Sequence, residues 1–144
     1  MERDVRLHGL TSDHHHALVL ASRIKEASTG GRLDAALVAD ARRRYEQELA
    51  PHFAVEEEEL LPALAARGRH DLVERTLREH ETLRGHLAAA EAGELARLEA
   101  FGQLLEAHVR FEERELFPVC EALVGDEVLA RVAERAPKGK PAGY

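Results

Sequence analysis

Apolar residues recur at helical spacing through most of the chain. Four such stretches, at about residues 12–28, 34–67, 70–91 and 94–123, predict four long helices. Short segments containing glycine separate them, and short connections favour antiparallel neighbours. The pattern therefore predicts an all-α fold, an up-down-up-down antiparallel four-helix bundle.

The faces predicted to point inward carry ionisable side chains among the apolar ones. The expected inward residues are Leu10, His14, Ala17, Ala21 and Ile24, then Leu37, Ala41, Tyr45, Leu49, His52, Glu56 and Leu60, then Val73, Leu77, His80, Leu83 and Leu87, and last Leu98, Phe101, Leu105, His108, Glu112 and Leu116. Within the second helix, Pro51 lacks a backbone N–H and predicts a kink or a locally widened turn beside His52.

The two ends of the chain have a different character from its middle. We expect an N-terminal arm at residues 1–9 with a turn at Gly9, the bundle at residues 10–124, and a short helix and tail at residues 125–144. The short helix is centred on Val128, Leu129 and Val132, and the tail from Pro137 is expected to be disordered. Thr11, Ser12 and Asp13 are the candidate caps of the first long helix.

Composition narrows the class of protein. A chain of 144 residues suits one domain, and its formal charge of −7 disfavours nucleic acid or an anionic membrane as partner. Cys120 is the only cysteine, so no intrachain disulfide can form, and we interpret it as an apolar filler. With no apparent signal peptide or transmembrane run, the expectation is a cytoplasmic monomer or small homo-oligomer.

An internal repeat carries the candidate chemistry. The segment from His52 to Pro62 recurs from His108 to Pro118 at a constant offset of 56 residues. The identical pairs are His52 and His108, Glu56 and Glu112, Glu57 and Glu113, Glu59 and Glu115, Leu60 and Leu116, and Pro62 and Pro118. Residues four apart lie above one another on a helix, so each copy presents a histidine and a glutamate on one face.

Six polar residues are thereby predicted to meet in the core, namely His14, His52, Glu56, His80, His108 and Glu112. Buried carboxylates need compensating charge, which a pair of metal ions would supply. Four imidazoles and two bridging carboxylates, without thiolate, suit iron, with manganese and zinc as alternatives. On the first helix His14 keeps the spacing to Ala17 and Ala21, and His15 is the alternative ligand.

Other polar residues receive different interpretations. Glu57 and Glu113 face about 100° away from their neighbouring glutamates and are expected at the surface or beside a ligating imidazole. His8, His70 and His86 fall off the inward faces and are expected at the surface. Tyr45 is expected to pack in the core.

These motifs resemble the hemerythrin-like (HHE cation-binding) family. The matching segments are Ser12–Leu18, His52–Pro62, Arg78–Arg84 and His108–Pro118. The resemblance implies a bundle with an oxo- or hydroxo-bridged di-iron centre, ligated by the six residues above, that binds dioxygen and in some members nitric oxide or peroxide.

The chain departs from the oxygen-carrying hemerythrins at two places. Those proteins have a His-x-x-x-His pair on the third helix, where Thr76 and Arg84 flank His80, and a longer final motif than His108-x-x-x-Glu112. The function expected first is binding or sensing of dioxygen, nitric oxide or peroxide. The alternatives are a di-iron oxidase, peroxidase or nitric-oxide-reducing enzyme, and iron storage or iron-centre repair.

Overall fold

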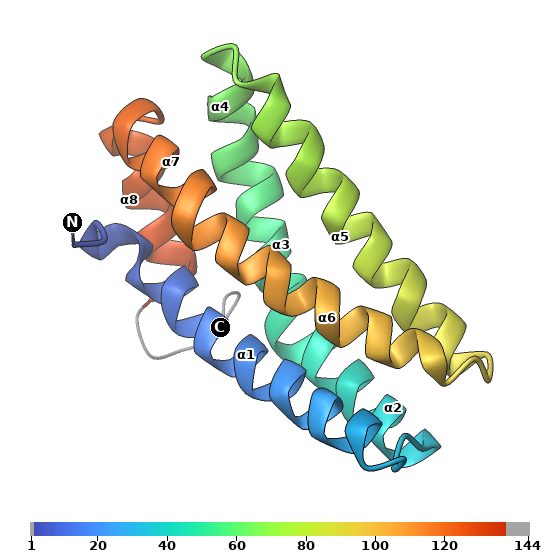
Figure 1. Cartoon of the computed structure of the whole chain (residues 1–144). Helices are drawn as coiled ribbons and strands as arrows, with labels where there is room; N and C mark the ends of the chain where they lie inside the picture. The colour runs from blue at the N-terminus through green and yellow to red at the C-terminus, as the bar shows by residue number, and fades with distance from the viewer. Residues whose placement is uncertain (1, 138–144) are drawn as a thin grey trace.

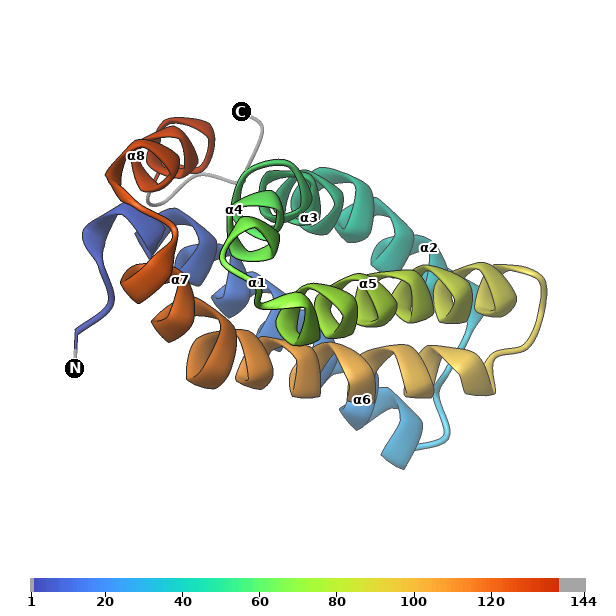
Figure 2. The same cartoon turned by 90° about the horizontal axis from the view of Figure 1, so that it is seen from above.

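The computed structural model describes residues 2–137, and within that range the chain forms helices and no strand. The prediction of an all-α protein is confirmed. Figures 1 and 2 show the long helices lying side by side, with α6 between α1 and α5. Residues 138–144, most of the predicted tail, lie outside the described residues.

The long helices fall close to where the hydrophobic pattern predicts them. A turn of 3-10 helix, η1 (Val5–Leu7), leads into α1 (His8–Thr29). One continuous helix follows, made of α2 (Ala35–Arg44), η2 (Tyr45–Leu49), α3 (Ala50–Val55), η3 (Glu56–Leu60) and α4 (Leu61–Ala66). The others are α5 (His70–Glu91), the continuous α6 (Ala96–Phe111), η4 (Glu112–Leu116) and α7 (Phe117–Leu123), and the short α8 (Asp126–Arg135).

The predicted caps of the first long helix, Thr11, Ser12 and Asp13, are wrong, because these residues lie inside α1. Two other connections carry ordinary end signals. The Asp34 side chain accepts a hydrogen bond of 2.8 Å from the backbone N–H of Leu37 and caps α2. Gly68, between α4 and α5, has a φ of 80°, which favours glycine over any other residue. The chain therefore reverses within a few residues at this connection.

Each proline of the long helices follows a π-helical turn by two residues. Pro51 follows η2, Pro62 follows η3 and Pro118 follows η4. A proline ring collides with the carbonyl four residues earlier, and the wider π turn relieves that collision. The widened turn predicted near Pro51 is confirmed. The other two π turns begin at Glu56 and Glu112, the glutamates of the repeat.

The first long helix begins earlier than predicted. The α1 helix begins at His8 and not near residue 12, so Gly9 lies inside it and is buried. The prediction of a turn at Gly9 is wrong, because this glycine serves close packing. A Cβ atom built on Gly9 would lie 1.5 Å from the backbone oxygen of Ala136, just beyond α8. The predicted domain boundaries at residues 9 and 125 stay a prediction.

Replacing Gly9 by alanine should therefore destabilise the fold, by about 3 kcal/mol, since backbone atoms of the α8 end must move. The matched control is Gly85→Ala on α5, where nothing lies within 4 Å of the added Cβ and about 1 kcal/mol should be gained. Urea unfolding measures both. A loss of stability in both variants, or in neither, would contradict the packing role of Gly9.

One face of α5 is rotated slightly from the prediction. Leu77, expected inside, is 40 % exposed, whereas Thr76 is fully buried and donates a hydrogen bond of 2.8 Å to the carbonyl of Leu72. The expectation for Leu77 is wrong because the inward stripe of α5 runs through Leu72, Thr76 and His80. Because an α-helix has about 3.6 residues per turn, a line of residues spaced by four gradually rotates away from a line of residues spaced by three.

The apolar core has two parts. One joins the start of α1 to α4, α7 and α8 through residues such as Leu10, Leu64 and Phe117. The other joins the remainder of α1 to α2, α5 and α6 through residues such as Ile24 and Leu105. His14, His52, His80 and His108 each fall in sequence between members of the two clusters. The polar layer therefore lies between two apolar ones.

None of the helices within residues 2–137 combines the length and apolar character needed to cross a membrane.

Candidate metal centre

Four helices each contribute one histidine to a buried polar layer. His14 comes from α1, His52 from α3, His80 from α5 and His108 from α6. Glu56 and Glu112 begin the π turns that follow two of these helices. All six side chains are buried, with at most 5 % of any residue exposed. His15 and His16 are exposed, so of the two alternatives on the first helix it is His14 that enters the layer.

The six residues form two groups of four that share both glutamates. The first group is His14, His52, Glu56 and Glu112, and the second is Glu56, His80, His108 and Glu112. Within each group, one nitrogen or oxygen atom per residue lies within 4.8 Å of every other. Each glutamate therefore has an oxygen available to both groups, which is the arrangement of a carboxylate bridging two ions.

All four imidazoles point Nε2 at the shared carboxylates. The Nε2 atoms of His14 and His108 lie 2.8 Å and 3.0 Å from opposite oxygens of Glu112. Those of His52 and His80 lie 3.0 Å and 3.1 Å from opposite oxygens of Glu56. The layer thus has an approximate two-fold symmetry that follows the sequence repeat.

The other ring nitrogen of every imidazole faces a carboxylate of its own. The Nδ1 atoms lie 2.6 Å from Glu113 for His14, 3.0 Å from Asp13 for His52, 2.7 Å from Glu57 for His80 and 2.6 Å from Glu79 for His108. A carboxylate only accepts hydrogen bonds, so Nδ1 donates in each case. The lone pair on Nε2 is thereby left for a cation.

Two of these four partners were predicted and two were missed. Glu57 and Glu113 stand beside imidazoles, as one of their interpretations proposed. Asp13 was predicted only as a candidate helix cap, which is wrong because it lies inside α1, and Glu79 received no role. Each directly precedes a histidine of the layer. That shared acid-His dipeptide was the available signal. The dipeptide does not show which histidine its acid contacts, because Asp13 and Glu79 pair with histidines on neighbouring helices and not with the histidine next to them in sequence.

Aromatic rings close the layer on both sides. Phe53 stacks on His80 with a centroid distance of 3.8 Å and lies edge-on to His52 and His108. Phe117 stacks on His14 at 5.3 Å. Phe53 was missed by the sequence analysis because the corresponding residue in the second repeat is Val109. These rings pack against the imidazoles and restrict their orientation.

The charge balance of the layer calls for cations. Burial disfavours protonated imidazole, yet the nearby carboxylates outweigh burial and raise the pKa of His80 to about 11 and that of His108 to about 9. Burial also lowers the pKa of His14, but Glu112 and Glu113 raise it above its usual value. The pKa of His52 is raised in the same way by Glu56, Asp13 and Glu112. Burial would raise the pKa of Glu112, but His108 and His14 hold it well below its usual range. Protons here occupy the place that metal ions would take.

Buried atoms without hydrogen-bond partners test the fit of a metal ion directly. Four of them belong to the second group, one from each residue: Glu56 Oε1, His80 Nε2, His108 Nε2 and Glu112 Oε2. His80 Nε2 lies 3.1 Å from Glu56 Oε1 and His108 Nε2 lies 3.0 Å from Glu112 Oε2, but neither contact has the geometry of a hydrogen bond. Such atoms are costly in a folded protein unless something binds them. Their mixture of imidazole nitrogen and carboxylate oxygen suits a first-row transition ion. The residues therefore fit a metal centre.

Comparison with known families agrees with this geometry. The sequence pattern of the Hemerythrin HHE cation binding domain matches residues 5–120. The chain belongs to this hemerythrin family. No match was found among curated proteins or solved structures. The match covers both groups of the polar layer and begins at the first residue of η1.

The remaining polar candidates lie outside this hemerythrin layer. His70 is exposed, and the half-buried His8 and His86 contact Arg3 and Arg97. Cys120 is buried in the apolar core, where burial and the nearby Glu56 and Glu112 raise the pKa of its thiol, in keeping with a filler role. Tyr45 packs edge-on to Phe53, as predicted for a core residue.

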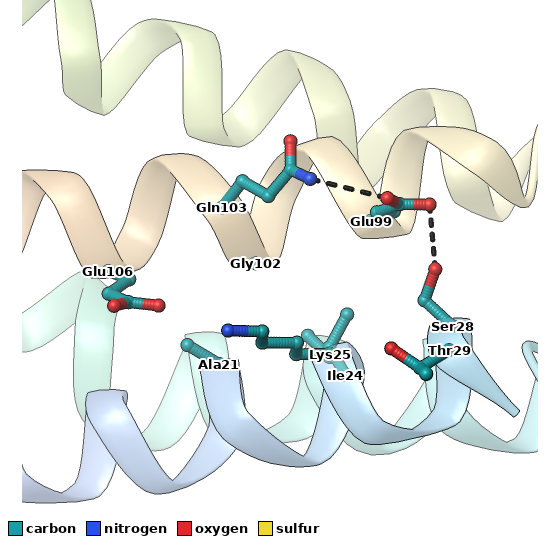
Figure 3. Close-up of a pocket in the computed structure, with 9 residues that line it drawn as sticks. All are labelled: Ala21, Ile24, Lys25, Ser28, Thr29, Glu99, Gly102, Gln103 and Glu106. Atoms are coloured by element: carbon teal, nitrogen blue, oxygen red, sulfur yellow. Dashed lines mark hydrogen bonds between the residues drawn. The ribbon is translucent and has the colours of Figure 1, made fainter.

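Two hollows on the surface are separate from the layer. One of about 330 Å³ lies between α1 and α6, where Lys25, Glu99, Gln103 and Glu106 surround Gly102 (Figure 3). Another of about 390 Å³ lies between the end of α1 and α2. Neither is lined by any of the six residues.

The carboxylates on Nδ1 should matter for metal affinity. Replacing Asp13 by asparagine and Glu79 by glutamine should each weaken metal binding about 10- to 100-fold, because the imidazole loses its orientation and part of its basicity. A competition titration with a chromophoric chelator measures this loss. The matched control is Glu91→Gln, whose carboxylate pairs with Arg42 away from the layer. Unchanged affinity in both test variants would show that these contacts do not tune the histidines.

Proposed function

We propose that this hemerythrin-like domain holds two iron ions and binds or senses dioxygen, nitric oxide or peroxide there. The observation that carries the proposal is the pair of four-residue groups sharing Glu56 and Glu112. Bound iron would supply reversible one-electron redox chemistry and a coordination position for a small ligand. His14 and His52 would hold one ion, and His80 and His108 the other.

The surrounding residues support a small ligand over a large substrate. All six candidate ligands are buried, and Phe53 and Phe117 stack on two of the imidazoles. The four Nδ1 carboxylates hold the rings and keep Nε2 unprotonated when a cation is present. A molecule of two or three heavy atoms can enter such a site through side-chain motion, whereas a larger substrate needs an open cleft.

The donor set favours iron. Imidazole and carboxylate without thiolate suit iron and manganese, and zinc accepts the same ligands. The likeness to the hemerythrin family adds weight to iron. We further propose that the four long helices form the up-down-up-down bundle of the oxygen-carrying hemerythrins, since each connection between them is short.

Elemental analysis of protein purified from iron-replete cells tests the proposal. We expect about two ions per chain, one for each group, with iron the major metal. Protein that carries no metal and takes up none from ferrous iron, manganese or zinc would refute it. Stopped-flow spectra of the reduced protein mixed with dioxygen, nitric oxide or peroxide then distinguish a binder from an enzyme. A stable adduct indicates binding, and repeated turnover indicates catalysis.

A further inference from the structure

The N-terminal segment reaches the polar layer through a single arginine. Figures 1 and 2 show the chain entering α1 beside α7 and α8. There Arg3 donates from Nη1 to Glu121 Oε1 at 2.6 Å and from Nη2 to the backbone carbonyl of Glu113 at 2.6 Å. Its Nη2 also lies 3.4 Å from Glu113 Oε1. One guanidinium therefore joins α7 to the start of η4.

Arg3 contacts the two side chains that pack against or pair with His14, namely Glu113 and Phe117. Glu113 is the carboxylate that accepts from His14 Nδ1, and Phe117 is the ring that stacks on His14. The Arg3 guanidinium lies over the Phe117 ring, 5.6 Å from its centroid. The arginine thus reaches His14 by a carboxylate and by an aromatic ring, without touching it.

The segment around Arg3 is itself held in place. The backbone N–H of Asp4 donates to Glu121 Oε2, and the Asp4 side chain caps η1 by accepting from the Arg6 N–H. His8 Nε2 lies 3.1 Å from the Arg3 carbonyl oxygen. Arg3 is consequently a fixed part of the fold and its side chain is only 19 % exposed.

The corresponding arginine contacts around the other imidazoles are more exposed to solvent or absent. Arg75 lies 3.0 Å from Glu79, the partner of His108, and 3.9 Å from the centroid of the Phe111 ring. Arg84 lies 3.8 Å from Glu57, the partner of His80. Both arginine side chains are over 40 % exposed, so water screens their charge. Within residues 2–137, Asp13 behind His52 is paired with no arginine or lysine. Of these three arginines, Arg3 is the one best shielded from water, with its side chain 19 % exposed.

We propose that Arg3 is a positioning residue of the metal centre. It fixes the orientation of Glu113 and, through Glu113 and Phe117, that of His14, so the ion held by His14 and His52 depends on the N-terminal segment. A fixed carboxylate keeps the Nδ1 proton of His14 in line and Nε2 aimed at the ion. This inference rests on the proposed metal-binding function.

Release of zinc to a chromophoric chelator, followed by stopped flow, tests this role. In Arg3→Gln we expect one of the two ions to leave about tenfold faster, the lower end of the effect of groups that orient a ligating histidine, while the other keeps its rate. Arg3→Lys retains the charge and should restore most of the difference. The matched control is Arg42→Gln, because Arg42 also pairs with a glutamate and lies over an aromatic ring, away from the layer.

A second measurement separates positioning from general stability. In ¹⁵N-labelled, zinc-loaded protein, Arg3→Gln should shift the Nδ1 resonance of His14 and leave that of His108 unchanged. Equal acceleration of both ions with a shift of all four histidines would overturn the proposal, as would rates and spectra identical to those of the unaltered protein. If the unaltered protein takes up no zinc or iron, the proposed function fails. The His14 resonance of the metal-free protein then decides the role of Arg3 alone.

Discussion

Replacing both Glu56 and Glu112 by alanine is expected to abolish metal binding, from about two ions per chain to none. Each glutamate supplies an oxygen to both groups, so the double variant leaves two imidazoles at each position and no bridge. The change also removes the negative charge that balances two cations in a buried layer. Metal analysis after dialysis against iron, manganese or zinc measures the outcome.

Glutamine variants at the same two positions separate loss of charge from loss of volume. Because glutamine has nearly the shape of glutamate, Glu56→Gln with Glu112→Gln should also lose both ions while leaving a smaller cavity than alanine. The matched control is Glu59→Gln with Glu115→Gln. These residues repeat at the same offset, three positions further on. Glu59 pairs with Arg131 and Glu115 with Arg75, and neither glutamate belongs to the two groups of four. Two ions retained in the glutamine double variant would mean that the assigned ligands are wrong.

The metal-free protein is expected to lose stability as the pH rises, whereas the metal-loaded protein should not. In the folded chain the pKa of His108 is raised to about 9 and that of His80 to about 11, against an ordinary value of 6.5. A raised histidine pKa stabilises the folded state fully below the unfolded pKa, and this contribution disappears as the pH passes the folded pKa.

Between pH 6.5 and pH 10 the protonation of His108 alone should account for a loss on the order of 3 kcal/mol, from a pKa raised to about 9. In the loaded protein the proposed ions would take the place of the proton on Nε2 of each imidazole, so no proton should be lost over the same range. Metal affinity should fall on acidification, because protons then compete for the same nitrogens. Urea unfolding of both forms at several pH values provides the measurement. Metal-free protein of constant stability up to pH 10 would contradict the proposed protonation of the layer.

Much of this architecture could be predicted from periodicity because the helices are long and their inward faces are regular. The α5 bounds coincide with the predicted residues 70–91, and the inward positions of the fourth helix are all buried. The prediction was wrong at Gly9, whose environment is created by the end of α8 more than a hundred residues later. Hydrophobic spacing predicts the inward face of a single helix, and it cannot predict that the backbone of a distant segment, here at Ala136, packs against that helix.

The six residues of the polar layer could also be named from the sequence. A histidine or glutamate on an apolar stripe is costly to bury, so its recurrence at matching positions in two halves indicates a shared partner. What periodicity could not provide was the pairing of each Nδ1 with a carboxylate. Asp13 and Glu79 contact histidines 39 and 29 residues away, and that choice depends on which helices are neighbours.

The sequence by itself determined the helical class, the repeat and the donor types, because these depend on local spacing and on side-chain chemistry. Only the tertiary structure showed how the donors divide into two groups and that Glu56 and Glu112 belong to both. It also showed that Arg3 contacts Glu113, the residue that pairs with His14. The physical reason is that a metal centre is defined by distances between atoms on different helices. Those distances follow from helix packing, and helix packing places Glu113 beside a histidine that precedes it by 99 residues.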